Sequence, residues 1–141
     1  MTIVLDRLAL PNGDPAPFAK QTGKRQMSAL TAMMPPVRYA DVNGIRIGFY
    51  EAGPKSDAPP VVLCHGWPEL AFSWRHQIKA LSEVGIRVIA PDQRGYGASD
   101  RPDDVEDYDL VHLTGDLVGL LDHLNIDKAI FVGHDWGGFV V

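Results

Sequence analysis

The spacing of hydrophobic positions changes several times along the chain, and each change predicts a different element. In the segment "VRYADVNGIRIGFYEAG", two short runs rich in β-forming residues lie on either side of Asn43 and Gly44. The Asn-Gly pair is the strongest short-range signal for a β-hairpin, because both turn positions need a positive φ. We therefore predict a hairpin at the start of the folded part of the chain.

Three later runs are short and apolar, namely Val61–Cys64, Ile86–Ala90, in which Arg87 is the one polar residue, and Ala129–Val132. Strands buried on both faces of a parallel sheet have this pattern, since helices cover both faces. We predict three buried parallel strands, the last of which leads through residues 133–138 into another helix.

Helical spacing separates these strands. Trp74, Ile78 and Leu81 fall on one helical face, and Gly85 is placed to end that helix. A longer helix is predicted to follow Asp109, which can cap it. Its core face is formed by Leu110, Leu113, Leu117, Leu120, Leu121 and Leu124. Strands that alternate with helices predict an α/β fold with a mostly parallel sheet.

Residues 1–35 differ from the rest in composition. They include the stretch "PNGDPAPFAK" and mix Pro, Gly, Ala and Lys without a sustained hydrophobic period. We expect a mobile N-terminal arm over these residues and one folded unit over residues 36–141.

Length and charge are those of an ordinary soluble domain. With 141 residues and 45% hydrophobic content, the chain can form one sizeable core. The formal charge of -5 argues against a protein that binds the nucleic-acid backbone, which needs a basic face. We interpret the acidic residues between Asp92 and Asp127 as a solvated surface of loops and helices.

Several further features of the sequence narrow the class of protein. Cys64 is the only cysteine, so we expect a buried free thiol and no disulfide. No apolar run is long enough to cross a membrane, and Asp6 and Arg7 interrupt the apolar start, which predicts a cytoplasmic protein without a membrane partner. The glycine motifs that bind phosphate are missing, and we expect no cofactor and no metal.

The segment "VGHDWGG", residues 132–138, predicts a reactive side chain. A buried strand, a sharp turn and then a helix form a nucleophile elbow, in which small residues let the strand and helix backbones approach each other. The free N–H groups and positive dipole end of the helix would keep Asp135 ionised. The alternative is that Asp135 only caps a helix.

A second loop favours the catalytic interpretation. His65, Gly66, Trp67 and Pro68 follow the strand Val61–Cys64, where this architecture supplies an N–H group of an oxyanion hole. Open α/β sheets bind ligands where the carboxyl ends of the strands meet. We therefore expect the two loops to converge on one site.

Three segments, "HGWPELAFSWRHQ", "APDQRGYGASDRP" and "VGHDWGG", together resemble an epoxide hydrolase of the α/β-hydrolase fold in order and spacing. The resemblance covers residues 36–141 and implies the N-terminal part of that fold, truncated after the nucleophile elbow. It implies Asp135 as the nucleophile and the backbone N–H groups of Trp67 and Trp136 as the oxyanion hole, with a cis bond before Pro68. The residues that would support these loops are His65, Gly66, Pro68, Gly133, His134, Gly137 and Gly138.

The resemblance also implies a reaction on a small-molecule epoxide. A carboxylate has a reference pKa of about 3.9 and is ionised at neutral pH, so it attacks a saturated carbon without a base. The product is an alkyl ester on the enzyme. Water activated by a His–acid pair would hydrolyse it to a diol, and two lid tyrosines would protonate the alkoxide.

Parts of that machinery are missing from this sequence. The acid and the histidine follow the nucleophile in this fold, yet none of the five histidines lies after Asp135. The tyrosines precede the lid and match it poorly. We expect the chain to be the N-terminal half of a longer enzyme, to fold poorly and lack turnover alone, and to need a complementing C-terminal half as partner.

Two alternatives stay open. A haloalkane dehalogenase would use the same Asp nucleophile, but such enzymes usually carry Asn where Trp67 stands. A non-catalytic protein, either a truncated product or one half of a split enzyme, is compatible with the missing base.

Overall fold

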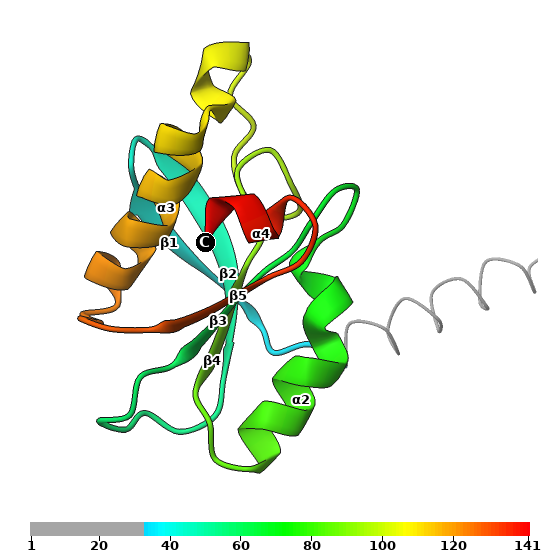
Figure 1. The fold of residues 1–141 in the computed structure, drawn as a ribbon, viewed down its shortest axis with the longest axis vertical. Coiled ribbons are helices and arrows are strands. Elements are labelled where there is room, and N and C mark those ends of the chain that lie inside the picture. The colour runs from blue at the N-terminus through cyan, green and yellow to red at the C-terminus, as the bar shows by residue number, and fades with distance from the viewer. Residues whose placement is uncertain (1–32) are drawn as a thin grey trace, which may run out of the picture. The chain divides into compact units, whose positions relative to one another are not determined.

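The computed structural model describes residues 33–141, which form a five-stranded sheet with helices on both faces (Figure 1). The strand order is β1-β2-β4-β3-β5. The pairs β1–β2 and β2–β4 are antiparallel, whereas β4–β3 and β3–β5 are parallel. The strands are β1 (Val37–Val42), β2 (Ile45–Ala52), β3 (Val61–Cys64), β4 (Val88–Pro91) and β5 (Ile130–Gly133). The predicted α/β class is confirmed.

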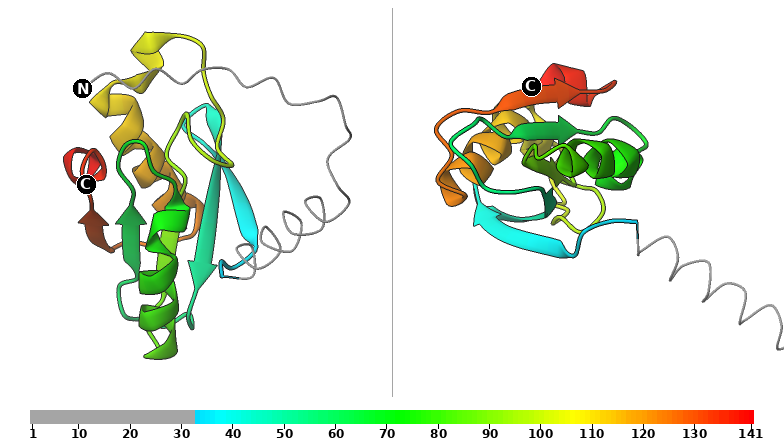
Figure 2. Two further views of the ribbon diagram at one scale, coloured as in Figure 1. Left: turned by 90° about the vertical axis from the view of Figure 1, so that its right-hand side faces the viewer. Right: turned by 90° about the horizontal axis from the view of Figure 1, so that it is seen from below.

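The helices cover the two faces of the sheet unequally (Figure 2). They are the 3-10 turns η1 (Ala71–Trp74) and η2 (Val105–Tyr108) and the α-helices α2 (Arg75–Glu83), α3 (Leu110–His123) and α4 (Gly137–Val140). Helix α2 packs through Ile78 on one face, and α3 and α4 pack on the other. Because β3 and β4 lie between these layers, all of their residues are buried, as the apolar runs predict.

The predicted hairpin is present and is tied to α3. Asn43 and Gly44 have φ values of 48° and 79°, and the register pairs Val42 with Ile45 across them. The side-chain amide of Asn43 donates to the carbonyl of His112 at 3.0 Å and to Oδ1 of Asp116 at 2.9 Å. The turn residue thus also fixes the edge hairpin against a helix that is distant in the sequence.

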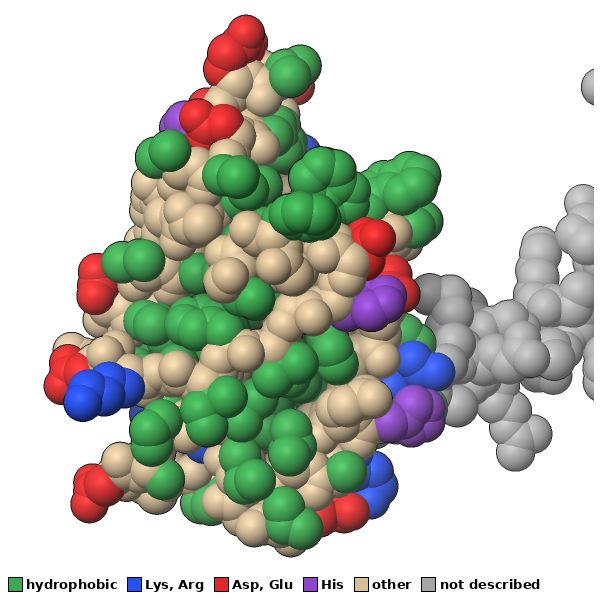
Figure 3. Space-filling model, in the orientation of Figure 1, with side chains coloured by type: hydrophobic (Ala, Val, Ile, Leu, Met, Phe, Trp, Pro, Cys, Tyr) green, Lys and Arg blue, Asp and Glu red, His purple; other side chains and the backbone are tan. Residues whose placement is uncertain are grey.

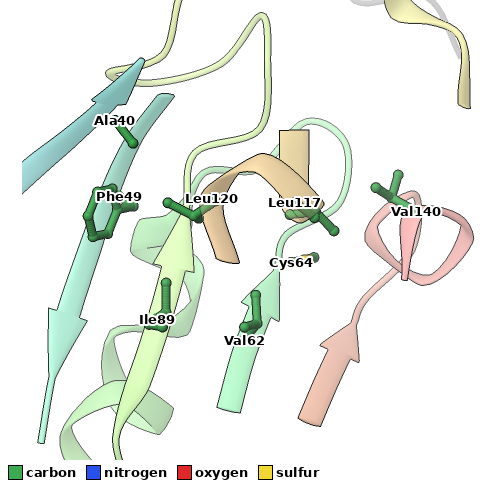
Figure 4. Packing of buried hydrophobic residues seen from close by; sticks show 8 residues of the cluster. All are labelled: Ala40, Phe49, Val62, Cys64, Ile89, Leu117, Leu120 and Val140. Atoms are coloured by element: carbon green, nitrogen blue, oxygen red, sulfur yellow. The ribbon is translucent and has the colours of Figure 1, made fainter. Parts of the chain in front are cut away.

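The core beneath α3 and α4 is a single apolar cluster, drawn in Figure 4. Its buried members are Ala40, Phe49, Val62, Cys64, Ile89, Leu117, Leu120 and Val140. Burial of a side chain such as Phe49 or Ile89 stabilises a fold by roughly 1.5–3 kcal/mol. Cys64 is a free buried thiol, as predicted, and burial raises its pKa to about 12.

The last strand is less buried than its sequence predicts. In β5, Ile130, Phe131 and Val132 are 55%, 36% and 40% exposed. The reason is its place in the sheet, since within residues 33–141 only β3 pairs with β5. The apolar run identifies a strand of a parallel sheet correctly but carries no information about which neighbours are present.

Two smaller differences concern element ends. Strand β4 begins at Val88 and not at Ile86, because Gly85 has a φ of 83° and the Ile86 N–H donates to the carbonyl of Leu81. Leu110 is 52% exposed and so is not part of the core. It lies at the first position of α3, directly after the predicted cap Asp109, which accepts from the His112 N–H at 2.8 Å.

Most of the predicted N-terminal arm, residues 1–32, lies outside the described residues. Of its last three residues, Met34 packs against the cluster beneath α2. In the described part of the chain, no helix is both long enough and apolar enough to cross a membrane. The cytoplasmic location stays a prediction.

Candidate active site

The segment after β5 forms the sharp turn that its glycines predict. Asp135 has a φ of 52°, in the left-handed region that non-glycine residues rarely adopt. The N–H groups of Gly137 and Gly138 donate to the carbonyls of His134 and Asp135 at 2.9 Å each, which starts α4. Because of this turn, the Asp135 side chain is exposed at the carboxyl end of the sheet.

Glycine is required at three of the predicted support positions. A Cβ on Gly133 would overlap the carbonyl group of Gly137, and one on Gly137 would overlap the carbonyl of Cys64. A Cβ on Gly66 would lie 2.6 Å from Cβ of Asp135. At Gly138, by contrast, the nearest atom would be 3.9 Å away, which is an ordinary contact. Close packing therefore demands glycine at 66, 133 and 137 but not at 138.

The loop after β3 meets the elbow at the Asp135 carboxylate. The Trp67 N–H donates to Oδ1 of Asp135 at 3.0 Å, and the Trp136 N–H also hydrogen-bonds this carboxylate. These two donors stabilise the ionised form and hold the pKa of the Asp135 carboxyl below its ordinary value. The bond between Trp67 and Pro68 is cis. The structure therefore brings together the nucleophile candidate and both N–H groups expected of an oxyanion hole.

His65 lies behind the Trp67 loop and is fully buried. Its Nε2 accepts from the Gln93 N–H at 3.0 Å, so the proton is on Nδ1, which lies 2.9 Å from the carbonyl of Gly66. Burial lowers the pKa of the His65 imidazole, although the Gly66 carbonyl and the acidic groups of Asp92 and Glu69 oppose this shift. The neutral ring thus connects the loop after β4 to the loop that carries Trp67.

His134 contributes through its main chain, and its ring points elsewhere. The His134 N–H donates to the carbonyl of Cys64 at 3.1 Å, and its own carbonyl accepts from Gly137. The ring is 63% exposed, and its Nδ1 lies 3.5 Å from Oε2 of Glu69. The backbone role expected of His134 therefore does not involve its side chain.

A buried carboxylate holds the third loop. Asp92, directly after β4, accepts from the N–H groups of Ala71 at 2.8 Å and Ala98 at 2.9 Å. A Cβ on Gly97 would overlap the carboxylate of Asp92, so the loop folds tightly over it. Three loops that follow β3, β4 and β5 are thus locked together at one edge of the sheet.

The chain matches a family model described as alpha/beta hydrolase fold over residues 59–141. The chain belongs to the alpha/beta hydrolase fold family. Among curated relatives of this alpha/beta hydrolase, Epoxide hydrolase A of Mycobacterium tuberculosis is 57% identical over 107 residues, which are 76% of this chain and 33% of the relative. Epoxide hydrolase 3 of Siraitia grosvenorii is 50% identical over 100 residues, 71% of this chain and 31% of the relative.

Solved structures give the same relationship. The crystal structure of Epoxide Hydrolase A from Mycobacterium thermoresistibile has a TM-score of 0.71 at 55% identity, covering 75% of this chain and 33% of that one. The epoxide hydrolase VrEH1 from Vigna radiata has a TM-score of 0.70 at 46% identity, covering 74% and 33%. This alpha/beta hydrolase therefore spans about a third of the length of the epoxide hydrolases it matches.

The interpretation of the acidic residues from Asp92 to Asp127 as solvated surface is wrong for two of them. Asp92 and Asp116 are only 2% and 4% exposed. Asp116 takes a bidentate ion pair from Arg94, with Nε to Oδ2 at 2.8 Å and Nη2 to Oδ1 at 2.7 Å. The hydrogen bond to Asp116 raises the pKa of Arg94. In this alpha/beta hydrolase the pair joins the loop after β4 to α3.

Sequence reasoning missed these supporting residues although a signal for them exists. Asp92, Gln93 and Arg94 follow directly after the buried strand β4, and polar residues at the carboxyl end of such a strand point to a site. Asp116 has a weaker signal, which is a lone carboxylate within the leucine face of α3. Its partner Arg94 is 22 positions away, so no local pattern reveals the pair.

Proposed function

We propose that this chain carries the nucleophile and the oxyanion hole of an epoxide hydrolase. The observation that supports this proposal is the convergence of the Trp67 and Trp136 N–H groups on the Asp135 carboxylate at the turn after β5. The epoxide hydrolases that the chain matches add independent support. A helix-capping role for Asp135 fits less well, because it lies in the left-handed region and accepts from a separate loop.

In the first step, a carboxylate oxygen of Asp135 attacks an epoxide carbon. A new C–O ester bond forms, the ring C–O bond breaks, and the ring oxygen leaves with the electron pair as an alkoxide that takes a proton from water. Two backbone donors keep the carboxyl ionised, since its pKa lies below the ordinary value, so the attack needs no base.

In the second step, water attacks the ester carbonyl and releases the diol. The tetrahedral oxyanion would accept from the same two N–H groups, and a donor of this kind contributes roughly 3–4 kcal/mol of transition-state stabilisation. This step needs a base. His65 uses both ring nitrogens within the loop framework, His112 pairs with Asp109, and the ring of His134 lies against Glu69. The other two histidines, His76 in α2 and His123 at the end of α3, are exposed helix residues outside the three loops. We therefore place the base on a complementing C-terminal half and expect this chain alone to stop at the ester.

The test is intact mass spectrometry of the 141-residue chain after incubation with phenyloxirane. We expect a single adduct of one oxirane, located on Asp135 by peptide mapping, and no diol above the amount formed without protein. Asp135→Asn removes the adduct, whereas Asp127→Asn keeps it, because Asp127 is exposed and precedes the start of β5, at the opposite end of that strand from the turn. An adduct that persists in Asp135→Asn contradicts the assignment of the nucleophile. Ester formation with a chloroalkane but not with an oxirane favours the dehalogenase alternative.

A further inference from the structure

A cleft of about 330 Å³ opens beside the elbow. Its side-chain walls come from Trp67, Tyr96, Tyr108, Leu113, Trp136 and Val140. Figure 3 shows hydrophobic side chains gathered over α4 and the loop that follows β3, where part of this wall lies. Asp135 itself does not line the cleft, although Trp136, the next residue in the chain, does. The cleft therefore lies next to the nucleophile and does not enclose it.

Three of the polar side chains that line the cleft already have hydrogen-bond partners within the chain. The guanidinium of Arg94 pairs with Asp116 and also donates to the carbonyl of Asp107 at 2.8 Å. The side-chain amide of Gln93 donates to the carbonyl of His65. The Tyr108 hydroxyl donates to the carbonyl of Pro102 at 2.8 Å. A bound group would therefore meet mainly aromatic rings and aliphatic carbons.

The cleft adjoins the reacting group through its two tryptophans. Trp67 and Trp136 both line the cleft, and their backbone N–H groups hydrogen-bond the Asp135 carboxylate. A substituent held in the cleft would therefore lie beside the two residues whose N–H groups hold the Asp135 carboxylate. Its size is also suitable, because an apolar cavity of about 150 Å³ already holds benzene and this cleft has about twice that volume.

We infer that this cleft is a subsite for an apolar, aryl-sized substituent of the epoxide, and that Leu113 at the start of α3 determines how large that substituent can be. The inference rests on the proposed function and adds a substrate class to it. Leu113 is the aliphatic wall residue that is only half-buried and can be replaced without removing an N–H donor or a buried ion pair.

The experiment measures the rate of Asp135 esterification in the 141-residue chain with phenyloxirane and with methyloxirane. Leu113→Trp fills the cleft, and we expect it to lower the phenyl-to-methyl rate ratio about tenfold or more, as loss of a fitted apolar group does. Val111→Trp is the matched control, because Val111 lies on the same helix and is 76% exposed. It should leave the ratio within about twofold of the unchanged chain.

A direct binding measurement separates the two proposals. Saturation-transfer NMR with phenylethane-1,2-diol should show binding to the unchanged chain and loss of binding in Leu113→Trp. An unaltered rate ratio in folded Leu113→Trp overturns the subsite while the proposed function stands. If neither oxirane esterifies the unchanged chain, the proposed function fails, and the subsite is then judged by diol binding alone. Equal diol binding to the unchanged chain and to Leu113→Trp, or no binding to either, overturns the subsite as well.

A second variant covers the case in which Leu113→Trp does not fold. Leu113→Ala widens the cleft and should shift preference from phenyloxirane toward the bulkier naphthyloxirane. A preference that stays unchanged in folded Leu113→Ala contradicts the inference.

Discussion

The N–H group of Trp67 donates to Oδ1 of Asp135 at 3.0 Å, although the two residues are 68 positions apart in the sequence. This contact exists because β3 and β5 are adjacent parallel strands, with Cys64 opposite Gly133, so the loops that follow them leave the sheet side by side. The geometry of the site is therefore a property of the sheet order. Loop residues need only be small enough to let the two backbones meet.

The first prediction concerns the ionisation of Asp135. Its carboxyl pKa should lie below the ordinary 3.8, because the Trp67 and Trp136 N–H groups bind the ionised form. Gly66→Ala should raise this pKa, since the added Cβ would lie 2.6 Å from Cβ of Asp135 and displace the Trp67 loop. Carboxyl NMR titration, assigned with Asp135→Asn, gives both values. An identical pKa in the two chains would show that the loop does not hold the carboxylate.

The second prediction compares neighbouring glycines of the elbow. Gly137→Ala should cost about 1–3 kcal/mol of unfolding free energy, because its Cβ would overlap backbone atoms that cannot turn aside. Gly138→Ala meets nothing closer than 3.9 Å and adds a residue of higher helix propensity, so it should be neutral or slightly stabilising. Urea unfolding of both variants measures the difference. Equal costs at the two positions would contradict the close approach of β3 and α4.

The third prediction concerns the buried pair of Arg94 and Asp116. Asp116→Leu leaves the guanidinium without its partner and should cost about 3–5 kcal/mol, as broken buried pairs do. The double variant Arg94→Met, Asp116→Leu should regain most of this loss. Glu83→Gln breaks an exposed pair with Lys79 and should cost less than about 0.5 kcal/mol. A double variant that is no more stable than Asp116→Leu would show that the cost arises from the loss of Asp116 alone.

Local patterns predict most of this fold, and the failures have a common cause. The hairpin at Asn43, the strands β3 and β4 and the cap at Asp109 follow from residues that are close in sequence. The convergence of the two loops also follows, because parallel neighbours end at one edge. The burial of Asp116 and the exposure of β5 depend on partners far along the chain or on sheet neighbours, which no local pattern records.

The last prediction is a pH dependence that arises from His65. Burial lowers the pKa of its imidazole below 6.5, so between the folded value and 6.5 the unfolded chain binds more protons than the folded chain. The stabilising contribution of neutral His65 is therefore complete above pH 6.5 and is lost as the pH falls below it. Protonation would also remove the acceptor that Nε2 offers to the Gln93 N–H, which holds the Trp67 loop in place.

Urea unfolding at about pH 7.5 and about pH 5.5 tests this dependence, since the slope of the unfolding free energy counts the protons taken up. The unchanged chain should be less stable at the lower pH, and His65→Asn should lose part of that slope even if it is less stable at both values. His76→Gln, at an exposed position of α2, should keep the slope of the unchanged chain. If His65→Asn and His76→Gln have the same slope, the acid sensitivity belongs to other groups, and His65 serves the loop only by packing.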